Sequence, residues 1–554
     1  MKKRIIALII AVLSVMSVVF AGCSGIEEEE VGDATKTQLY VAIYNGGFGS
    51  AWFSEMEKRF EEAHKDDTCW EDGKTGVDVV PYANKDDLEA SVLLNTMSGL
   101  KYEVFFTEGD YYQAMLDKNL LLDITDAVKT DKLPNETKTI EDKLSDSQKA
   151  YFSRDSYNTS NAKYYAAPYY SAAQGLSYNI DLFDQKNLFF AKGGCPSEHL
   201  YPLSGFEEGE YNYTNLEGDR SAGPDGEYET FDDGLPATLE DFEIWITHCS
   251  EIVTPVTWSG FFGTVYTNYI LNAMFYQSEN EDTRNLYYNF RENATFDAVK
   301  LETIEGKSFE TEKVTLTKGN YNELMRQPGR LYSLRMFELL AKYVDGEAKK
   351  SSTNVAAQKD FLNDDKEIAL LVEGNWWYNE AKDAGLFSLL RKDEKQSNYA
   401  MMPLPHATEA QIGSQNVLYD GNNAMIFVNK NIAKNKEALA KEFIKFACTD
   451  KSCEEFLSLT GSLRDLSFDI DVNSNIYKNL TPFAKNYLAL KNRSTVVYKG
   501  YTSPTLKAEL NKKYLNEIWQ CSVGGSIKVP VTTFFYDSNI HANDLFKGLY
   551  QFTK

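Results

Sequence analysis

Short apolar runs alternate with amphipathic stretches through the first third of the chain, and this alternation limits the fold more than any other feature. Residues 39–44, 77–82 and 103–107 are apolar and β-rich, which predicts strands. Residues 51–64 and 86–98 have apolar side chains at helical spacing, which predicts helices between those strands. Strands separated by helices form βαβ units, so the sequence predicts an α/β fold built on parallel-type sheets.

The remainder of the chain has further element signals. Thr238 followed by Asp241 has the spacing of a capping box, which predicts the start of a helix. Residues 434–449 predict another helix, residues 367–374 a buried strand, and residues 299–317 have β-type alternation. The α/β pattern therefore extends over most of the chain.

The N-terminus has the features of a secretion signal. Three basic residues precede an apolar run over residues 5–20, which is shorter than the roughly 18 residues of a membrane-spanning helix. The run ends in Ala21-Gly22-Cys23, which resembles the bacterial lipobox, although Phe20 stands where leucine is usual. The sequence predicts a signal peptide over residues 1–22 and a lipid on Cys23. The alternative is an ordinary signal peptide with an incidental cysteine.

Residues 23–36 include four consecutive glutamates and predict a solvated acidic tether between the lipid and the folded body. No later segment is apolar enough to span a membrane. We therefore expect the body at the extracellular face of the cell membrane, held there by the lipid.

Charge and motif content exclude several function classes. The 554 residues have a formal net charge of −25, which excludes a nucleic-acid binder because such a protein needs a basic face. No C-x-x-C, H-x-x-H or H-E-x-x-H spacing occurs, so the sequence indicates no zinc site. The six cysteines after position 23 permit disulfides outside the cell, but the sequence leaves their pairing open.

Polar residues follow the first and third predicted strands. Asn45 and Ser50 lie in a glycine-rich turn after the first strand, and Glu108 and Asp110 follow the third. Ligands of α/β proteins collect outside the carboxyl ends of such strands. The turn lacks the glycine spacing of a phosphate-binding loop, and we expect it to let the backbone approach a neutral ligand. The alternative role for Glu108 and Asp110 is to cap the next helix.

Two aromatic groups are candidates for a binding surface. Trp376 and Trp377 follow the predicted strand 367–374, and adjacent residues that leave a strand point in opposite directions. We therefore expect one ring in the core and the other in a cleft. Tyr266 and Tyr269 continue a repeat at helical spacing that starts at Trp258 and Phe262, and a buried helix stripe is the alternative role for them.

Four stretches together resemble the extracellular solute-binding lipoproteins of carbohydrate ABC importers, the maltodextrin-binding-like family. They begin with LYVAIYNGGFGSAWFSEMEKRFEEAH and YAAPYYSAAQGLSYNIDLF. The other two are EIALLVEGNWW and a C-terminal stretch around ALAKEFIKFACTDKSCEEFL. They are spread over about residues 38–470 in the family's order, behind the lipobox.

The resemblance implies two α/β lobes with a ligand cleft between them, and closure of the lobes by a hinge motion. The implied first lobe is 37–167 plus 427–470, and the second is 168–426 plus 471–554. An aromatic ring covers the apolar face of a sugar, and carboxylates, amides or cations bind its hydroxyls. With the residues above, Tyr170 beside the first crossing and Arg464 in a later turn complete the implied site. The implied partners are an oligosaccharide and the membrane permease, and the implied state is a monomer that needs no cofactor.

An acidic insertion is a candidate calcium site. Asp219, Asp225, Glu227 and Asp232 place oxygen ligands around Gly226, which suits Ca²⁺. The regular frame of an EF-hand is missing, and a solvated acidic loop is the favoured alternative.

Other functions stay open at this stage. The same fold could bind a peptide, a metal or a polyamine, or serve as a sensor without its own importer. A secreted glycosidase is the weakest alternative, because it needs two carboxyl groups at a set separation and abundant acid does not supply that geometry. The sequence predicts a protein that is not an enzyme, and it leaves the identity of the sugar open.

Overall fold

The computed structural model describes most of the chain after the N-terminal segment. The described residues are 32–82, 88, 90–109, 111–154, 163–202, 211–284, 286, 291–350, 352–498, 519–521, 529–535 and 541–553. The predicted signal peptide, Cys23, most of the tether and Asp110 lie outside them.

The first sheet contains the strands predicted near the start of the chain. Its order is β2-β1-β3-β17-β6, and β1 runs parallel to both β2 and β3. The bounds are β1 Thr37–Ile43, β2 Val77–Tyr82, β3 Val104–Thr107, β6 Ala166–Pro168 and β17 Met425–Val428. All four residues of β3 and of β17 are buried, as expected for central strands of a sheet covered on both faces.

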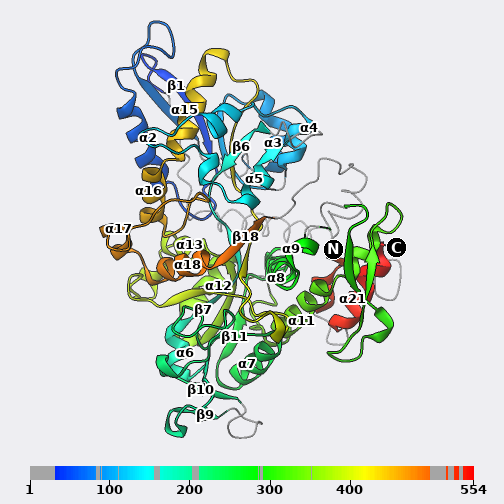
Figure 1. The fold of residues 1–554 in the computed structure, drawn as a ribbon. Coiled ribbons are helices and arrows are strands. Elements are labelled where there is room, and N and C mark those ends of the chain that lie inside the picture. Colours follow the sequence, from blue (N-terminus) through cyan, green and yellow to red (C-terminus); the bar gives the residue numbers. More distant parts are fainter. Residues whose placement is uncertain are drawn as a thin grey trace, which may run out of the picture.

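Helices from two distant parts of the sequence cover this sheet. In α2, Trp52, Met56 and Phe60 lie on one buried face, and this helix contacts both α15 and α16. Figure 1 shows these three helices on one side of the first lobe, at the top of the view. The bounds are α2 Ala51–Ala63, α3 Ala90–Thr96, α4 Tyr112–Asp117, α5 Asp146–Phe152, α15 Glu437–Ala447 and α16 Asp450–Thr460.

The second sheet lies in the other lobe, below the first in Figure 1. Its main order is β11-β14-β7-β16-β18, and β15 also pairs with β7. The bounds are β7 Ala173–Asn179, β11 Thr254–Thr257, β14 Ile368–Gly374, β15 Tyr399–Met402, β16 Asn416–Asp420 and β18 Ser494–Tyr498.

The second sheet mixes strand directions. β11 is parallel to β14 and β16 is parallel to β18, whereas β7 is antiparallel to β14, β15 and β16. A strand that enters from the other lobe needs no helical crossover on the sheet face, so it is free to pair in the antiparallel direction. Short-range patterning could not reveal this feature.

Helices and small strand pairs surround the second sheet. Helix α7 starts at the predicted capping box, where Thr238 and Asp241 bond to each other's backbone N–H. Helix α8 packs against α11 and against β7, β14 and β16. The bounds are α6 Ile180–Lys186, α7 Leu239–Ile252, α8 Gly263–Ser278, α9 Glu281–Arg284, α11 Pro328–Tyr343, α12 Asn354–Leu362, α13 Trp377–Asp383, α14 Leu386–Leu389, α17 Asn475–Asn479, α18 Pro482–Asn492, α20 Val531–Phe535 and α21 Ala542–Thr553.

The alternation predicted over 299–317 includes β13, which pairs antiparallel with β12, whereas all but the last residue of β12 precede that range. The remaining small sheets are β8-β10-β9, β19-β20 and β4-β5. The bounds are β4 Ser153–Arg154, β5 Lys163–Tyr164, β8 Phe189–Phe190, β9 Tyr201–Pro202, β10 Asn212–Thr214, β12 Thr295–Val299, β13 Thr311–Thr315, β19 Gln520–Cys521 and β20 Val529–Pro530.

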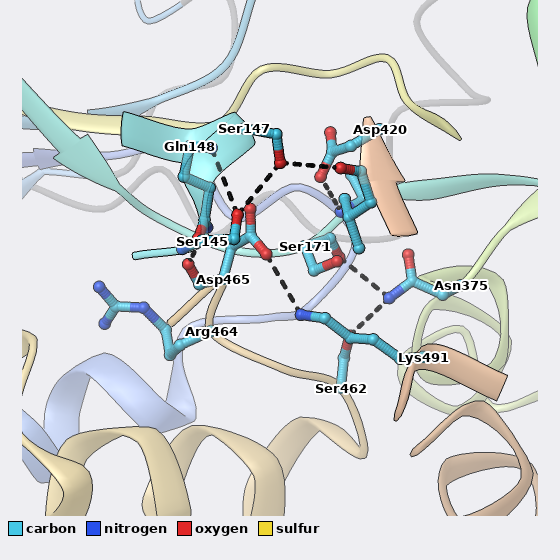
Figure 2. Close-up of polar contacts among 12 residues, drawn as sticks. Ser145, Ser147, Gln148, Ser171, Asn375, Asp420, Ser462, Arg464, Asp465 and Lys491 are labelled. Atoms are coloured by element: carbon cyan, nitrogen blue, oxygen red, sulfur yellow. Dashed lines mark hydrogen bonds and ion pairs between the residues drawn. The ribbon is translucent and has the colours of Figure 1, made fainter. Parts of the chain in front are cut away.

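The chain passes between the lobes at three crossing segments, over residues 169–172, 421–424 and 461–474. Buried polar side chains join these segments. Asn375 Nδ2 donates to the carbonyl oxygen of Ser171 at 3.0 Å and to Ser462 Oγ at 2.7 Å. Lys491 pairs with Asp465 at 3.2 Å, as Figure 2 shows. The crossing segments are therefore joined by a network of buried hydrogen bonds and ion pairs.

Within the described residues, no helix is long and apolar enough to cross a membrane. The six cysteines there are all free thiols.

Candidate functional site between the lobes

The glycine-rich turn after β1 lies directly against side chains at the hinge and from the second lobe. Gly46 and Gly47 both have positive φ, at 59° and 84°. A Cβ on Gly46 would lie 2.2 Å from the Tyr170 hydroxyl oxygen, and one on Gly47 would lie 3.1 Å from Trp376 Cδ1. Glycine at these positions lets the turn lie close to its neighbours, as expected. In this structure the neighbours are the side chains of Tyr170 and Trp376 instead of a ligand.

The two adjacent tryptophans have different surroundings. Trp377 is 0% exposed, and its Nε1 donates to Ser177 Oγ at 2.9 Å inside the second lobe. Trp376 is 7% exposed and packs with the hydrophobic core of the first lobe, although its strand belongs to the second. Trp377 is thus a core residue, and Trp376 lies where the lobes meet.

Helix α8 brings two tyrosines to the same place. The Tyr269 ring lies 5.8 Å from that of Trp376 and 5.2 Å from that of Tyr266, and it packs against the cores of both lobes. The helix begins only at Gly263, so Trp258 and Phe262 precede it instead of continuing its stripe. Trp258 is fully buried, while Phe262 is exposed.

A buried carboxyl group lies beside these tyrosines. Glu373, near the end of β14, is fully buried and hydrogen bonds to the Tyr266 hydroxyl. Burial first, and then the negative charge of Glu380, raises the pKa of Glu373 well above its usual value. Burial likewise raises the pKa of Tyr266, so both groups favour their neutral forms.

Glu108 lies at the hinge side of the site. It accepts hydrogen bonds from the Tyr170 hydroxyl and, at 2.9 Å, from Asn422 Nδ2. The N-cap of α4 is Tyr111, without a side-chain cap, so Glu108 is not the helix cap that was the alternative role. Glu108 therefore links the end of β3 to both of the first two crossing segments.

A direct hydrogen bond closes the contact between the lobes. Asn379 Nδ2, in the first turn of α13, donates to the carbonyl oxygen of Gly47 at 2.9 Å. Asp383 lies one turn further, where a Cβ on Gly49 would approach its Oδ2 to 2.8 Å. Sequence reasoning missed Asn379, Asp383 and Glu373. Asn379 and Asp383 lie about one and two helical turns after Trp376, and Glu373 lies three residues before it. This spacing is the only sequence signal that could have indicated them.

Three predicted residues lie outside this cluster. Asn45 is exposed and its Oδ1 accepts from the Gly47 backbone N–H at 3.2 Å, which stabilises the turn. Ser50 is exposed and begins α2 without a side-chain cap.

Arg464 is fully buried beneath the first crossing segment. It donates to the carbonyl oxygens of Pro168, Tyr169 and Ala447. Its guanidinium hydrogen bonds to the backbone of the first crossing segment and of α15, so in this structure Arg464 has a structural role and lies outside the candidate site.

The acidic insertion uses its carboxylates within the protein. Asp225 and Glu227 both bind Arg493 Nη1, at 2.9 and 3.1 Å, and Asp219 pairs with His199. Asp232 is buried and accepts from Thr230 Oγ1 at 2.7 Å. Across the part of the chain that the structure describes, no three His, Cys, Asp or Glu side chains form a group that could hold a metal ion. The calcium hypothesis therefore has no support from the geometry of this loop.

A cavity of about 1060 Å³ opens on the second lobe between α7 and α11, away from the cluster around Trp376. Its lining includes the Lys307–Glu243 pair at 2.7 Å and the His541–Glu338 pair at 2.7 Å. We place the candidate site between the lobes, where side chains of both lobes meet around Trp376.

No protein-family model and no curated protein sequence matches the chain. Its fold is similar to that of solved structures. A chitin oligosaccharide binding protein is 12% identical, with 94% of this chain and 98% of that protein covered and a TM-score of 0.55. A structure on xylan utilization by the thermophilic bacterium Caldanaerobius polysaccharolyticus is 12% identical, with 93% and 99% covered and a TM-score of 0.55.

The maltose-maltodextrin binding protein of the thermoacidophilic bacterium Alicyclobacillus acidocaldarius is 11% identical, with 93% and 100% covered and a TM-score of 0.50. At these identities the similarity shows the fold alone. The chain has the two-lobed α/β fold of these binding proteins, as the sequence predicted.

Proposed function

We propose that this chain is an extracellular solute-binding lipoprotein that captures a sugar, with an oligosaccharide favoured, and delivers it to an ABC importer permease. The observation that carries the proposal is the position of Trp376 between the lobes, covered by the glycine turn of the opposite lobe. An aromatic face beside amide and carboxyl groups is the combination that a pyranose needs.

Closure of the lobes is the step that this geometry supports. With the lobes apart, Trp376, Asn379 and Tyr269 would face water, and a sugar could stack on the Trp376 ring. With the lobes together, Gly47 contacts Trp376 and Asn379, so closure would enclose what lies on the ring. The similar fold of the sugar-binding proteins above supports this proposal.

A polyamine receptor is the second candidate. Glu373 and Glu380 lie beside Tyr266, and their described partners include the amides of Gln358 and Asn354. The Glu380 carboxylate and the aromatic rings also suit an organic cation, and Glu373, which favours its neutral form, would offer a hydrogen-bonding group. Differential scanning fluorimetry with sugars, polyamines, peptides and metal ions separates these ligands, because binding to the folded state raises the melting temperature.

Replacing Trp376 by alanine is expected to weaken binding of the best sugar at least about tenfold, or 1.4 kcal/mol, because the stacking face is lost. Isothermal titration calorimetry measures this change. Leu389→Ala is the control, since that side chain is 63% exposed and lies on α14, outside the candidate site. Wild-type affinity in the Trp376 variant would show that the sugar does not stack there.

Replacing Cys23 by alanine is expected to leave the protein unprocessed or to release it into the medium, because the lipid is attached to that side chain. Membrane fractionation with intact-mass analysis measures both results. A variant that stays on the membrane in mature form would contradict lipid anchoring.

A further inference from the structure

Two buried carboxyl groups lie among the segments that join the lobes. Asp420 ends β16 immediately before the crossing segment 421–424, and it is 1% exposed. Its Oδ2 accepts a hydrogen bond from the Ala172 backbone N–H, in the crossing segment 169–172, at 2.8 Å. Asp465 belongs to the third crossing segment and is 4% exposed. The two carboxyl groups therefore involve all three crossing segments, and Figure 2 shows both among the polar contacts of this region.

Asp465 has hydrogen-bonding partners in both lobes. Its Oδ1 lies 3.2 Å from Lys491 Nζ of α18, and its Oδ2 accepts from the Tyr498 hydroxyl at the end of β18. Its backbone carbonyl oxygen accepts from Gln148 Nε2 of α5, in the first lobe. Tyr498 is also the partner of Asp420 in the register of β16 with β18. A rotation of the lobes about the crossing segments therefore has to disturb the bonds around these two carboxyl groups.

The surroundings of the pair balance one negative charge and not two. The charged and titratable side chains that interact with Asp420 in the described part of the chain include Asp465, Lys491, Tyr487 and Tyr498. Burial raises the pKa of both tyrosines, so they stay neutral, and Lys491 is the cation of this set. Arg464, next to Asp465 in the chain, donates to backbone carbonyl oxygens instead.

One proton is therefore shared by the pair near neutral pH. Burial first, and then the negative charge of Asp465, raises the pKa of Asp420 to about 7. Below this pH the cluster holds one carboxylate, one neutral carboxyl group and one ammonium group. Above it, a second carboxylate has to be accommodated in the same buried space.

We propose that Asp420 and Asp465 form a proton-sensitive hinge, in which uptake of one proton favours the closed lobes and strengthens ligand binding. This inference rests on the proposed function, and it adds regulation of the same site by pH. With the lobes in contact, both carboxyl groups are buried, so a second negative charge there is unfavourable. Rotation of the crossing segments admits water to the pair and lowers that cost. Ligand is therefore held more tightly in acid than at alkaline pH.

The test measures the affinity for the best sugar by isothermal titration calorimetry from about pH 5.5 to about pH 8, on either side of the pKa of Asp420. We expect the wild-type affinity to fall about tenfold as the pH rises, because one unit of difference in pKa between closed and open lobes corresponds to this factor. Asp420→Asn cannot ionise, so its affinity should stay constant. A constant wild-type affinity, or the wild-type change in Asp420→Asn, would overturn the link between the hinge and binding.

The matched control is Asp471→Asn, which changes an exposed carboxylate in the same crossing segment as Asp465. Its affinity should follow that of the wild type at every pH. Lys491→Gln is a second variant that keeps both carboxyl groups. Without the ammonium group, the pair holds its proton more tightly, so the midpoint of the change in affinity should move up by about one pH unit. A midpoint at the wild-type pH would contradict the proposal.

Small-angle X-ray scattering of the ligand-free proteins tests the hinge without a sugar. We expect the radius of gyration of the wild type and of Asp471→Asn to increase as the pH rises, and that of Asp420→Asn to stay constant. A wild-type radius that does not change with pH, or an equal change in Asp420→Asn, overturns the hinge. Failure of the proposed function is distinguishable, because no sugar would then bind at any pH while the scattering still tests the hinge.

Discussion

Replacing Trp377 by alanine is expected to lower the free energy of unfolding by about 3–5 kcal/mol, the usual cost of removing a buried tryptophan. The ring is fully buried among Phe361, Tyr399 and Phe483, at centroid distances of 5.3–5.5 Å. Its indole N–H also loses the Ser177 acceptor. Urea unfolding measures the change, and sugar binding well below the melting temperature should persist.

The matched control for this prediction is Trp376→Ala. Trp376 packs against the core of the opposite lobe. If the lobes separate without unfolding, as the proposed function requires, its removal should cost less stability. Equal losses in the two variants would contradict the assignment of one ring to the core and the other to the contact between the lobes.

Replacing Asp420 by asparagine is expected to flatten the dependence of stability on pH. Asp420 ends β16, is buried, and accepts from the Ala172 backbone N–H at 2.8 Å. Burial first, and then the negative charge of Asp465, raises the pKa of Asp420 to about 7. Lys491, which pairs with Asp465, favours the charged form, and the Tyr487 and Tyr498 rings complete the buried surroundings.

The raised pKa determines the direction in which stability changes with pH. A carboxyl group with a higher pKa in the folded state stabilises that state below about pH 4, and this stabilisation is lost as the pH rises to about 7. The stability of the wild type relative to Asp420→Asn should therefore fall as the pH rises over this range.

Urea unfolding at a series of pH values measures this difference. The control is Asp471→Asn, which changes an exposed carboxylate in the third crossing segment. Its profile should run parallel to that of the wild type. A parallel profile for Asp420→Asn as well would contradict the role of Asp420.

Local signals predicted most of the fold. The capping box at Thr238 and the apolar run that became β14 are set by neighbouring residues, so the sequence alone reveals them. The antiparallel direction of β7 depends on where the chain re-enters a sheet after crossing from the other lobe. No short-range pattern encodes that path.

The candidate site was harder to predict than the fold. The sequence predicted that Trp376 and Trp377 differ in their surroundings, but it could not assign which ring lies in the core. Both residues are at the start of α13 and not in an extended strand, so strand alternation is not the cause of the difference. Arg464 lies apart from the cluster because its guanidinium donates to backbone carbonyl oxygens. In the sequence, such an arginine looks the same as one that binds a ligand. Asn379 was missed because its partner, the Gly47 carbonyl, is 332 residues away in the chain.

The cover over Trp376 has an optical consequence. The sequence contains seven tryptophans, and Trp52, Trp245, Trp258 and Trp377 are fully or almost fully buried within single lobes. Separation of the lobes would hydrate Trp376 while leaving these four rings dry. Its indole emission would then shift to longer wavelength, and the protein would report its own opening and closing by intrinsic fluorescence, without an attached dye.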